Sequence, residues 1–114
     1  MKNGKLVTYL GFCIRARNIV FGVDDIDAQR KGVFVLLCDN ALGASSVKTL
    51  QKAKERLGCP VIAIRAGMLG EYLNRPAVKA VGIKDKNLAS AILKEAENEQ
   101  DWIINSELYS GGVN

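Results

Sequence analysis

The sequence predicts an α/β protein in which helices pack on both faces of a sheet. Short apolar segments rich in β-branched residues alternate with longer amphipathic segments, which is typical of layered α/β folds. The segment 33–38 is apolar at every position, which indicates a strand covered on both faces. With 114 residues, 48% of them apolar and 25% charged, the chain has the size and composition of one folded domain. We assign this domain to residues 1–100 and a C-terminal tail to residues 101–114.

Hydrophobic periodicity and turn residues place the elements in order. Aspartates predict two helix starts, because their carboxylates can accept from the first N–H groups of a helix, and glycines predict two helix ends. The tail mixes aromatic and apolar residues with serine and glycine, so we expect it to dock as an extra turn and to fray at its end. The predicted helices are 5–17, a short helix capped by Asp24 and reaching Lys31 before Gly32, a helix capped by Ser45 or Ser46 and ending at Leu57 before Gly58, a short helix after Gly67, and a helix capped by Asp85 and extending to Ala96. The predicted strands are 19–21, 33–38, 61–64 and 77–83. For the last strand, the sequence does not decide which residues share one face.

Charge and cysteine usage narrow the function classes. The net charge of +4 suits a polyanionic partner such as nucleic acid, although many cytosolic proteins share it. Cys13, Cys38 and Cys59 each lie in an apolar pattern, which favours buried thiols in a reducing cytosol. The chain has no histidine and no Cys-x-x-Cys pair, so a zinc site or a Cys–His nucleophile is not expected. No run of about eighteen apolar residues predicts a membrane span.

The stretch from Leu10 to Gly32 is the leading candidate site. Basic residues flank a helix start that follows Gly22, and such a start directs N–H groups and the positive end of a helix dipole outward, which favours an anion. The alternative is that Gly22 and Asp24 only form a turn and a cap, and that Arg15 and Arg17 are solvated at a helix end. The only acidic cluster, Asp24, Asp25 and Asp27, is accounted for by a helix start, so we predict a non-catalytic protein with no cofactor or metal.

A set of weak motifs gains specificity from its order and spacing. They are Leu10-Gly11, Arg15-Ala16, Ile19-Val20-x-Gly22, Gly32 before the apolar strand, Asp39, Gly58-Cys-Pro60-Val61-Ile62, Leu69-Gly70 and Val81-Gly-Ile83. Over residues 5 to 96 the chain resembles the kink-turn RNA-binding ribosomal proteins of the L-seven-Ae/L-thirty-e family, in particular the short bacterial members. The resemblance implies a three-layer α-β-α sandwich with a mixed four-stranded sheet that binds RNA at one end of the sheet, without catalysis.

The RNA-binding motif of that family is only partly kept. Its pattern Gly-x-Asn-Glu-x-x-Lys corresponds here to Gly22 through Ala28, with Asp24 in place of Asn, Asp25 in place of Glu, and Ala28 in place of Lys. Aspartate only accepts hydrogen bonds and adds negative charge near phosphates, whereas asparagine can also donate at a base edge. The changes could abolish kink-turn specificity while basic residues keep a salt-dependent general RNA affinity.

We therefore predict a cytoplasmic, ribosome-associated or otherwise RNA-binding protein. It would hold structured RNA with the Gly22 to Asp25 helix start and the Arg65 to Leu69 loop. A protein-interaction module of the same fold that has lost specific RNA recognition is the alternative. The candidate RNA-binding residues are Arg15, Arg17, Gly22, Asp24, Asp25, Arg30, Lys31, Arg65, Met68 and Leu69.

Overall fold

The computed structural model describes residues 4–98 and the backbone of residues 102–104. The predicted order of helices and strands is confirmed, with differences at several boundaries. The helices are α1 (Gly4–Arg15), α2 (Val23–Asp27), α3 (Ala44–Leu57), α4 (Met68–Leu73) and α5 (Lys86–Ala96). The strands are β1 (Ile19–Phe21), β2 (Val35–Asp39), β3 (Val61–Ile64), β4 (Ala80–Ile83) and β5 (Trp102–Ile104).

The strands form one mixed sheet in the order β1-β4-β2-β3-β5. The central strands β2 and β3 are parallel, and every other neighbouring pair is antiparallel. The predicted mixed sheet is thus confirmed, and β5 adds a further strand beside β3. Part of the predicted tail is therefore an edge strand, not a turn. The last residues of the tail, where fraying was expected, lie outside the described residues.

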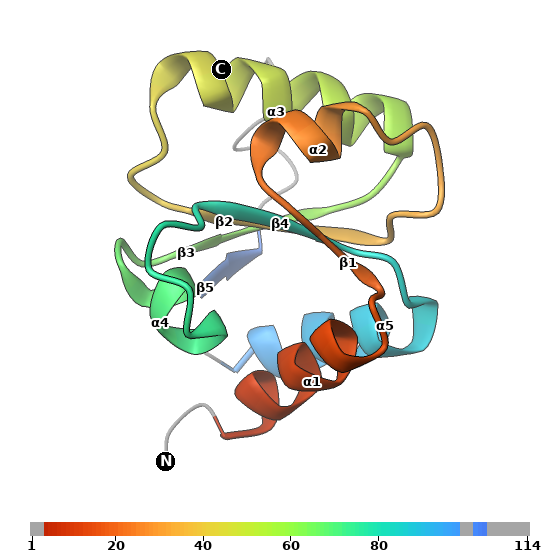
Figure 1. Ribbon diagram of the computed structural model, residues 1–114, viewed down its shortest axis with the longest axis vertical. Helices are drawn as coiled ribbons and strands as arrows, with labels where there is room; N and C mark the ends of the chain where they lie inside the picture. The colour runs from red at the N-terminus through yellow and green to blue at the C-terminus, as the bar shows by residue number, and fades with distance from the viewer. Residues whose placement is uncertain (1–3, 99–101, 105–114) are drawn as a thin grey trace.

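Helices cover both faces of the sheet, as the α-β-α sandwich requires (Figure 1). Helices α1, α4 and α5 lie on one face, and α2 and α3 lie on the other. Alternate residues of each strand supply the two cores: Leu37 points into the α1 side, whereas Leu36 and Cys38 point into the α3 side. The three cysteines are buried, as predicted. Among the described residues, no helix has the length and apolarity needed to cross a membrane.

Helix caps explain where the predictions held and where they failed. Asp85 caps α5 by accepting from the Leu88 N–H (2.8 Å), and Gly58 ends α3 in the left-handed conformation, both as predicted. Asp24, however, is not a cap, because α2 begins at Val23 and Gly22 occupies the cap position with φ 93°. The cap predicted for α3 at Ser45 or Ser46 is also wrong, since Gly43 precedes the helix and makes no side-chain cap bond.

Helix α2 is much shorter than predicted and ends at Asp27 instead of Lys31. The cause is Arg56 on α3. Its guanidinium donates to the carbonyl oxygens of Asp27 (2.8 Å) and Gln29 (3.0 Å). The Asp27 carbonyl would accept from the Lys31 N–H if α2 continued to Lys31. The chain therefore leaves α2 early and crosses to β2 as an irregular segment.

Candidate functional site

One end of the sheet gathers four connecting segments, and we call it the Asp39 end. Strands β1, β2 and β3 finish there and β4 begins there, because β2 and β3 are parallel and β4 is antiparallel to β1 and β2. The segments are residues 22, 40–43, 65–67 and 74–79. Four segments that are well separated in the sequence therefore meet at this end.

Asp39 joins three of these segments through one buried carboxylate. Its side chain is only 1% exposed. The carboxylate accepts from the N–H of Ala41 (2.7 Å) and the N–H of Gly67 (3.0 Å), and its Oδ2 lies 3.7 Å from Lys79 Nζ. Burial alone would raise the pKa of Asp39, but the two backbone hydrogen bonds and the Lys79 charge outweigh it and hold the pKa below its usual value. Asp39 is thus a charged group inside the fold that orders the loops above it.

Backbone hydrogen bonds fix the same segments to the strand ends. The Asp39 N–H donates to the Lys79 carbonyl (2.8 Å), and the Asn40 N–H donates to the Ile64 carbonyl (2.7 Å). On the outer side, the Gly22 N–H donates to the Ala80 carbonyl (2.8 Å). The loops at this end are therefore held by the sheet itself.

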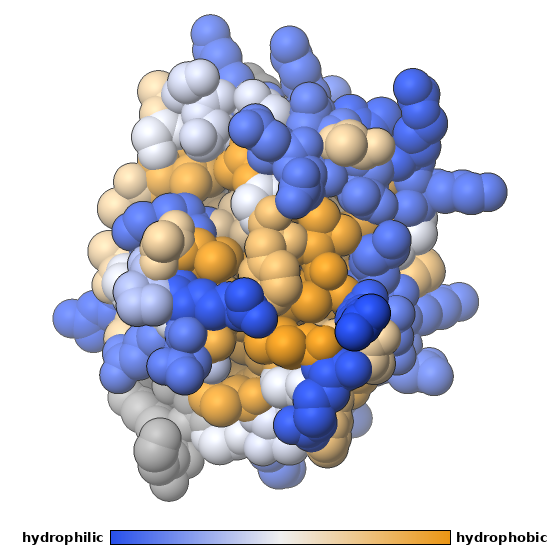
Figure 2. Space-filling model, viewed as in Figure 1, coloured by the Kyte–Doolittle hydropathy of each residue, from blue (hydrophilic) through white to orange (hydrophobic). Residues whose placement is uncertain are grey.

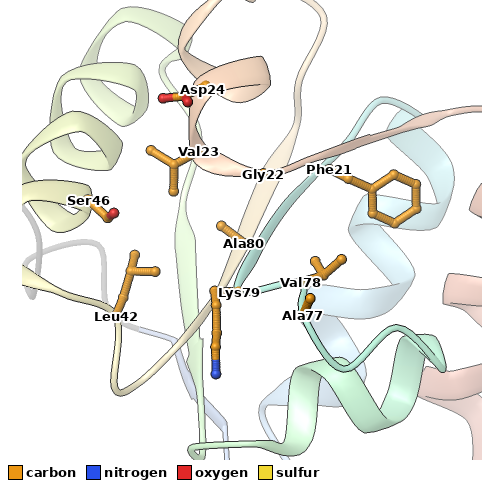
Figure 3. A pocket seen from close by; sticks show the side chains of 10 residues that line it. All are labelled: Phe21, Gly22, Val23, Asp24, Leu42, Ser46, Ala77, Val78, Lys79 and Ala80. Atoms are coloured by element: carbon orange, nitrogen blue, oxygen red, sulfur yellow. The ribbon is translucent and has the colours of Figure 1, made fainter.

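A shallow groove of about 430 Å³ opens between α2, α3 and the start of β4 (Figure 3). Val23, Leu42 and Ala80 supply apolar surface, whereas Asp24 on α2 and Ser46 on α3 supply polar rims. Lys79 points away from Asp24 in this view. The groove combines apolar surface with few polar groups. Its lining consists of Phe21, Gly22, Val23, Asp24, Leu42, Ser46, Ala77, Val78, Lys79 and Ala80.

Several predicted site residues lie together at this end. Gly22 and Asp24 line the groove, and Asp25 is exposed in the same helical turn. Arg65 is exposed directly after β3, and Met68 is half-buried at the start of α4. Two of the predicted segments, the Gly22 turn and the Arg65 loop, therefore share one end of the sheet.

Leu69 is a correction to the predicted site. Its side chain is fully buried in the core between the sheet and helices α1, α4 and α5. An apolar residue in this core cannot contact RNA directly. The Leu69-Gly70 motif instead packs α4, because a Cβ at Gly70 would lie 3.0 Å from the Arg75 carbonyl oxygen and from Pro76 Cα.

Four predicted basic residues lie at the opposite end, which we call the Arg56 end. Arg15 and Arg17 lie just before Asn18, the residue after which β1 begins. The Asn18 carbonyl accepts from the N–H of Lys84, which follows the last residue of β4, so this is the end of the sheet at which β4 finishes. Arg30 and Lys31 lie in the connection from α2 to β2, next to the Arg56 contacts with Gln29. The sheet therefore separates these four cations from Gly22 and Arg65. The residues that were predicted to form one site thus form two groups at opposite ends of the sheet.

The helix start after Gly22 offers little to an anion. Helix α2 has only five residues, so few peptide dipoles align, and Asp24 and Asp25 already place negative charge in its first turn. The cap N–H of Gly22 is bonded to Ala80. The groove is better suited to a neutral or planar group than to a bare phosphate.

Sequence reasoning missed three residues at the Asp39 end. Asp39 was noted only as part of a motif, because the backbone N–H groups from which it accepts carry no sequence signal. Lys79 lies just before β4, in a segment whose facing the sequence left open. Arg75 stacks on Phe21, with its guanidinium carbon 4.4 Å from the ring centroid, and no local pattern joins these two residues.

Comparisons with known proteins support the fold alone. The sequence matches no protein-family profile and no curated protein. Among solved structures, the chain is similar to a protein of unknown function from Bacillus halodurans, with a TM-score of 0.65 and 21% identity over 79% of this chain and 94% of the other. Two chains of such different sequence thus share this α/β arrangement.

Proposed function

We propose that the protein binds structured RNA, of the kink-turn type or a related bent form, with the Asp39 end of the sheet. The observation that carries the proposal is the juxtaposition at this end of an apolar groove with the exposed cations Arg65, Arg75 and Lys79. Proteins that bind irregular RNA need cations for the backbone and apolar surface for unstacked bases. The resemblance to ribosomal kink-turn binders directs attention to the same end.

The role of each group follows from its place. Arg65 and Lys79 would contact phosphates, and Val23, Leu42 and Ala80 would contact the face of a base. Asp39 would act indirectly, because it is buried and holds the Gly67 turn and Lys79 in place. No reaction is assigned, and the protein would act in the cytoplasm as a non-catalytic component of a ribonucleoprotein, with the ribosome as a candidate assembly.

Asp24 and Asp25 favour a second candidate, a protein-interaction module. Both carboxylates are exposed beside the groove, where they would repel phosphates. A module that binds a protein with a basic surface would use the same end and would not bind RNA. The two candidates therefore differ in the sign of the charge that they prefer.

Titration of the protein with a kink-turn RNA and with a matched plain duplex, at two salt concentrations, tests the proposal. We expect tighter binding to the kinked RNA and an Arg65→Ala loss of affinity of about three- to tenfold, with a salt slope lower by about one for a lost phosphate contact. Lys31→Ala, at the Arg56 end, is the matched control and should change affinity much less.

The results of the titration distinguish specific RNA binding from general charge attraction and from a protein-interaction module. Equal and weak affinities for both RNAs that vanish at moderate salt would remove the specific proposal. An equal loss from Arg65→Ala and Lys31→Ala would place binding on overall charge and not on the Asp39 end. No binding to either RNA would favour the interaction module.

A further inference from the structure

The outer edge of β1 is an open sheet edge with apolar surroundings. Among the described residues, β1 pairs only with β4. Helix α2 is the helix that makes the most contacts with β1. Figure 1 shows β1 in front of the rest of the sheet, and Figure 2 shows apolar side chains gathered in the middle of that same face with hydrophilic ones around them. Ile19 and Phe21 are partly exposed. This surface borders the groove, and Phe21 and Asp24 belong to both.

The backbone of β1 has a defined hydrogen-bonding direction. Asn18 accepts from Lys84 and Gly22 donates to Ala80, so these residues and Val20 point their peptide groups toward β4. The N–H and C=O groups of Ile19 and Phe21 then point to the open edge. No residue of β1 is charged or proline, which are common means of protecting such an edge.

The sequence around β1 is complementary to itself when two copies run antiparallel. Pairing Ile19 of one copy with Phe21 of the other, around a two-fold axis at Val20, uses the outward peptide groups of both strands. The same register brings the Arg17 end of one strand beside the Asp24 and Asp25 end of the other. Arg17, Asp24 and Asp25 are all exposed, so opposite charges would meet at both ends of the paired strands.

We propose that β1 is the interface of a symmetric homodimer in which two copies of the chain join their sheets edge to edge. The occupant is a second copy because the outward peptide groups, the apolar residues and the charges all satisfy one two-fold register. A two-fold interface requires such self-complementarity. In this interface Arg17 lies beside Asp24 and Asp25 of the second copy, whereas the RNA proposal assigns Arg17 no contact.

The first test is sedimentation equilibrium of the full chain, without RNA, from about 10 µM to 1 mM, the range in which a small interface dimerises. We expect a reversible monomer–dimer equilibrium. A monomer at every concentration would overturn the proposal. Because no RNA is present, this result is independent of the outcome of the RNA titration.

Charge reversal supplies the second test. Arg17→Glu places like charges opposite each other in the dimer, and so does Asp24→Arg with Asp25→Arg. Each should weaken dimerisation by about tenfold or more. An equimolar mixture should form a heterodimer, because the reversed charges of one variant then face those of the other. Recovery in the mixture also shows that both variants are folded.

Lys52→Glu is the matched control, since Lys52 is exposed on α3 and the change in net charge equals that of Arg17→Glu. It should leave the dissociation constant within about twofold of the original protein. Dimers that neither reversal weakens, or weakened dimers that the mixture does not restore, would assign the interface to another surface and overturn the proposal.

Discussion

The two ends of the sheet hold their connecting segments with charges of opposite sign and different burial. At the Asp39 end, a buried carboxylate accepts from backbone N–H groups of two loops. At the Arg56 end, a partly exposed guanidinium donates to two backbone carbonyls. Each charge satisfies backbone groups that no helix or strand satisfies. The ends differ in what replaces the side chain when it is removed.

Water can replace Arg56 more readily than Asp39. The Arg56 side chain is 33% exposed, whereas the Asp39 side chain is 1% exposed. Loss of a buried acceptor leaves donors without a partner, while loss of an exposed donor leaves carbonyls that water can reach. The candidate site therefore lies at the end where removal of the charged side chain costs more stability. Three substitutions measure how far the two ends differ in this cost.

Asp39→Ala should have the largest effect. It removes the acceptor of the Ala41 and Gly67 N–H groups and the partner of Lys79, and leaves a small cavity. We expect the free energy of unfolding to fall by about 3 kcal/mol. Urea denaturation measures this loss, and hydrogen exchange of the Ala41 and Gly67 amides should rise with it.

The pH dependence of stability checks the same charge. Because the pKa of Asp39 is lowered by folding from its usual value of 3.8, its contribution is complete above that value and is lost as the pH falls through the folded pKa. The stability difference between the original protein and Asp39→Asn should therefore shrink below about pH 4. A difference that stays constant from pH 7 to pH 3 would show that the carboxylate charge contributes nothing.

Gly70→Ala should have the next largest effect, through packing at the Asp39 end. The new Cβ would lie 3.0 Å from backbone atoms of Arg75 and Pro76, which cannot rotate away as a side chain would. We expect a loss of about 2 kcal/mol in urea denaturation, with displacement of the segment that carries Lys79.

Gly43→Ala is the control for that substitution. Gly43 has φ −68°, and a Cβ there meets nothing within 4 Å, so stability should change by less than about 0.5 kcal/mol. Equal losses at both glycines would show that the close approach of α4 to Arg75 does not limit packing.

Local patterns predicted the elements, and long-range contacts decided their ends. The alternation of apolar strands and amphipathic helices gave the α/β fold, and Asp85 and Gly58 marked helix ends that need only neighbouring residues. The end of α2 depends on Arg56, which lies 27 residues from Gln29, so no local pattern contains it. The strand β5 depends on pairing between Trp102 and Ile64 in the same way.

The candidate site was predicted in part for the same reason. Gly22 and Arg65 were recognised from their turns, and the sheet does bring their loops to one end. The predicted cations Arg17 and Lys31 lie at the other end, because strand direction, which sequence patterns do not show, decides which loops meet. Asp39 was overlooked as a site residue because its partners are backbone N–H groups, and these carry no sequence signal.

Arg56→Ala should have the smallest of the three effects and tests the Arg56 end directly. Removing the guanidinium frees the carbonyls of Asp27 and Gln29 and breaks the 3.5 Å contact with the Asp27 carboxylate. Since water reaches this end, we expect a loss of about 1 kcal/mol in urea denaturation, with faster hydrogen exchange in residues 28–34. Arg56→Lys should restore little, because one ammonium cannot reproduce the two-sided geometry of the guanidinium. Lys52→Ala on the same helix is the control and should change stability by less than about 0.5 kcal/mol. If Arg56→Ala costs as much as Asp39→Ala, burial is not what distinguishes the two ends, and the Arg56 end is as much a part of the framework as the candidate site.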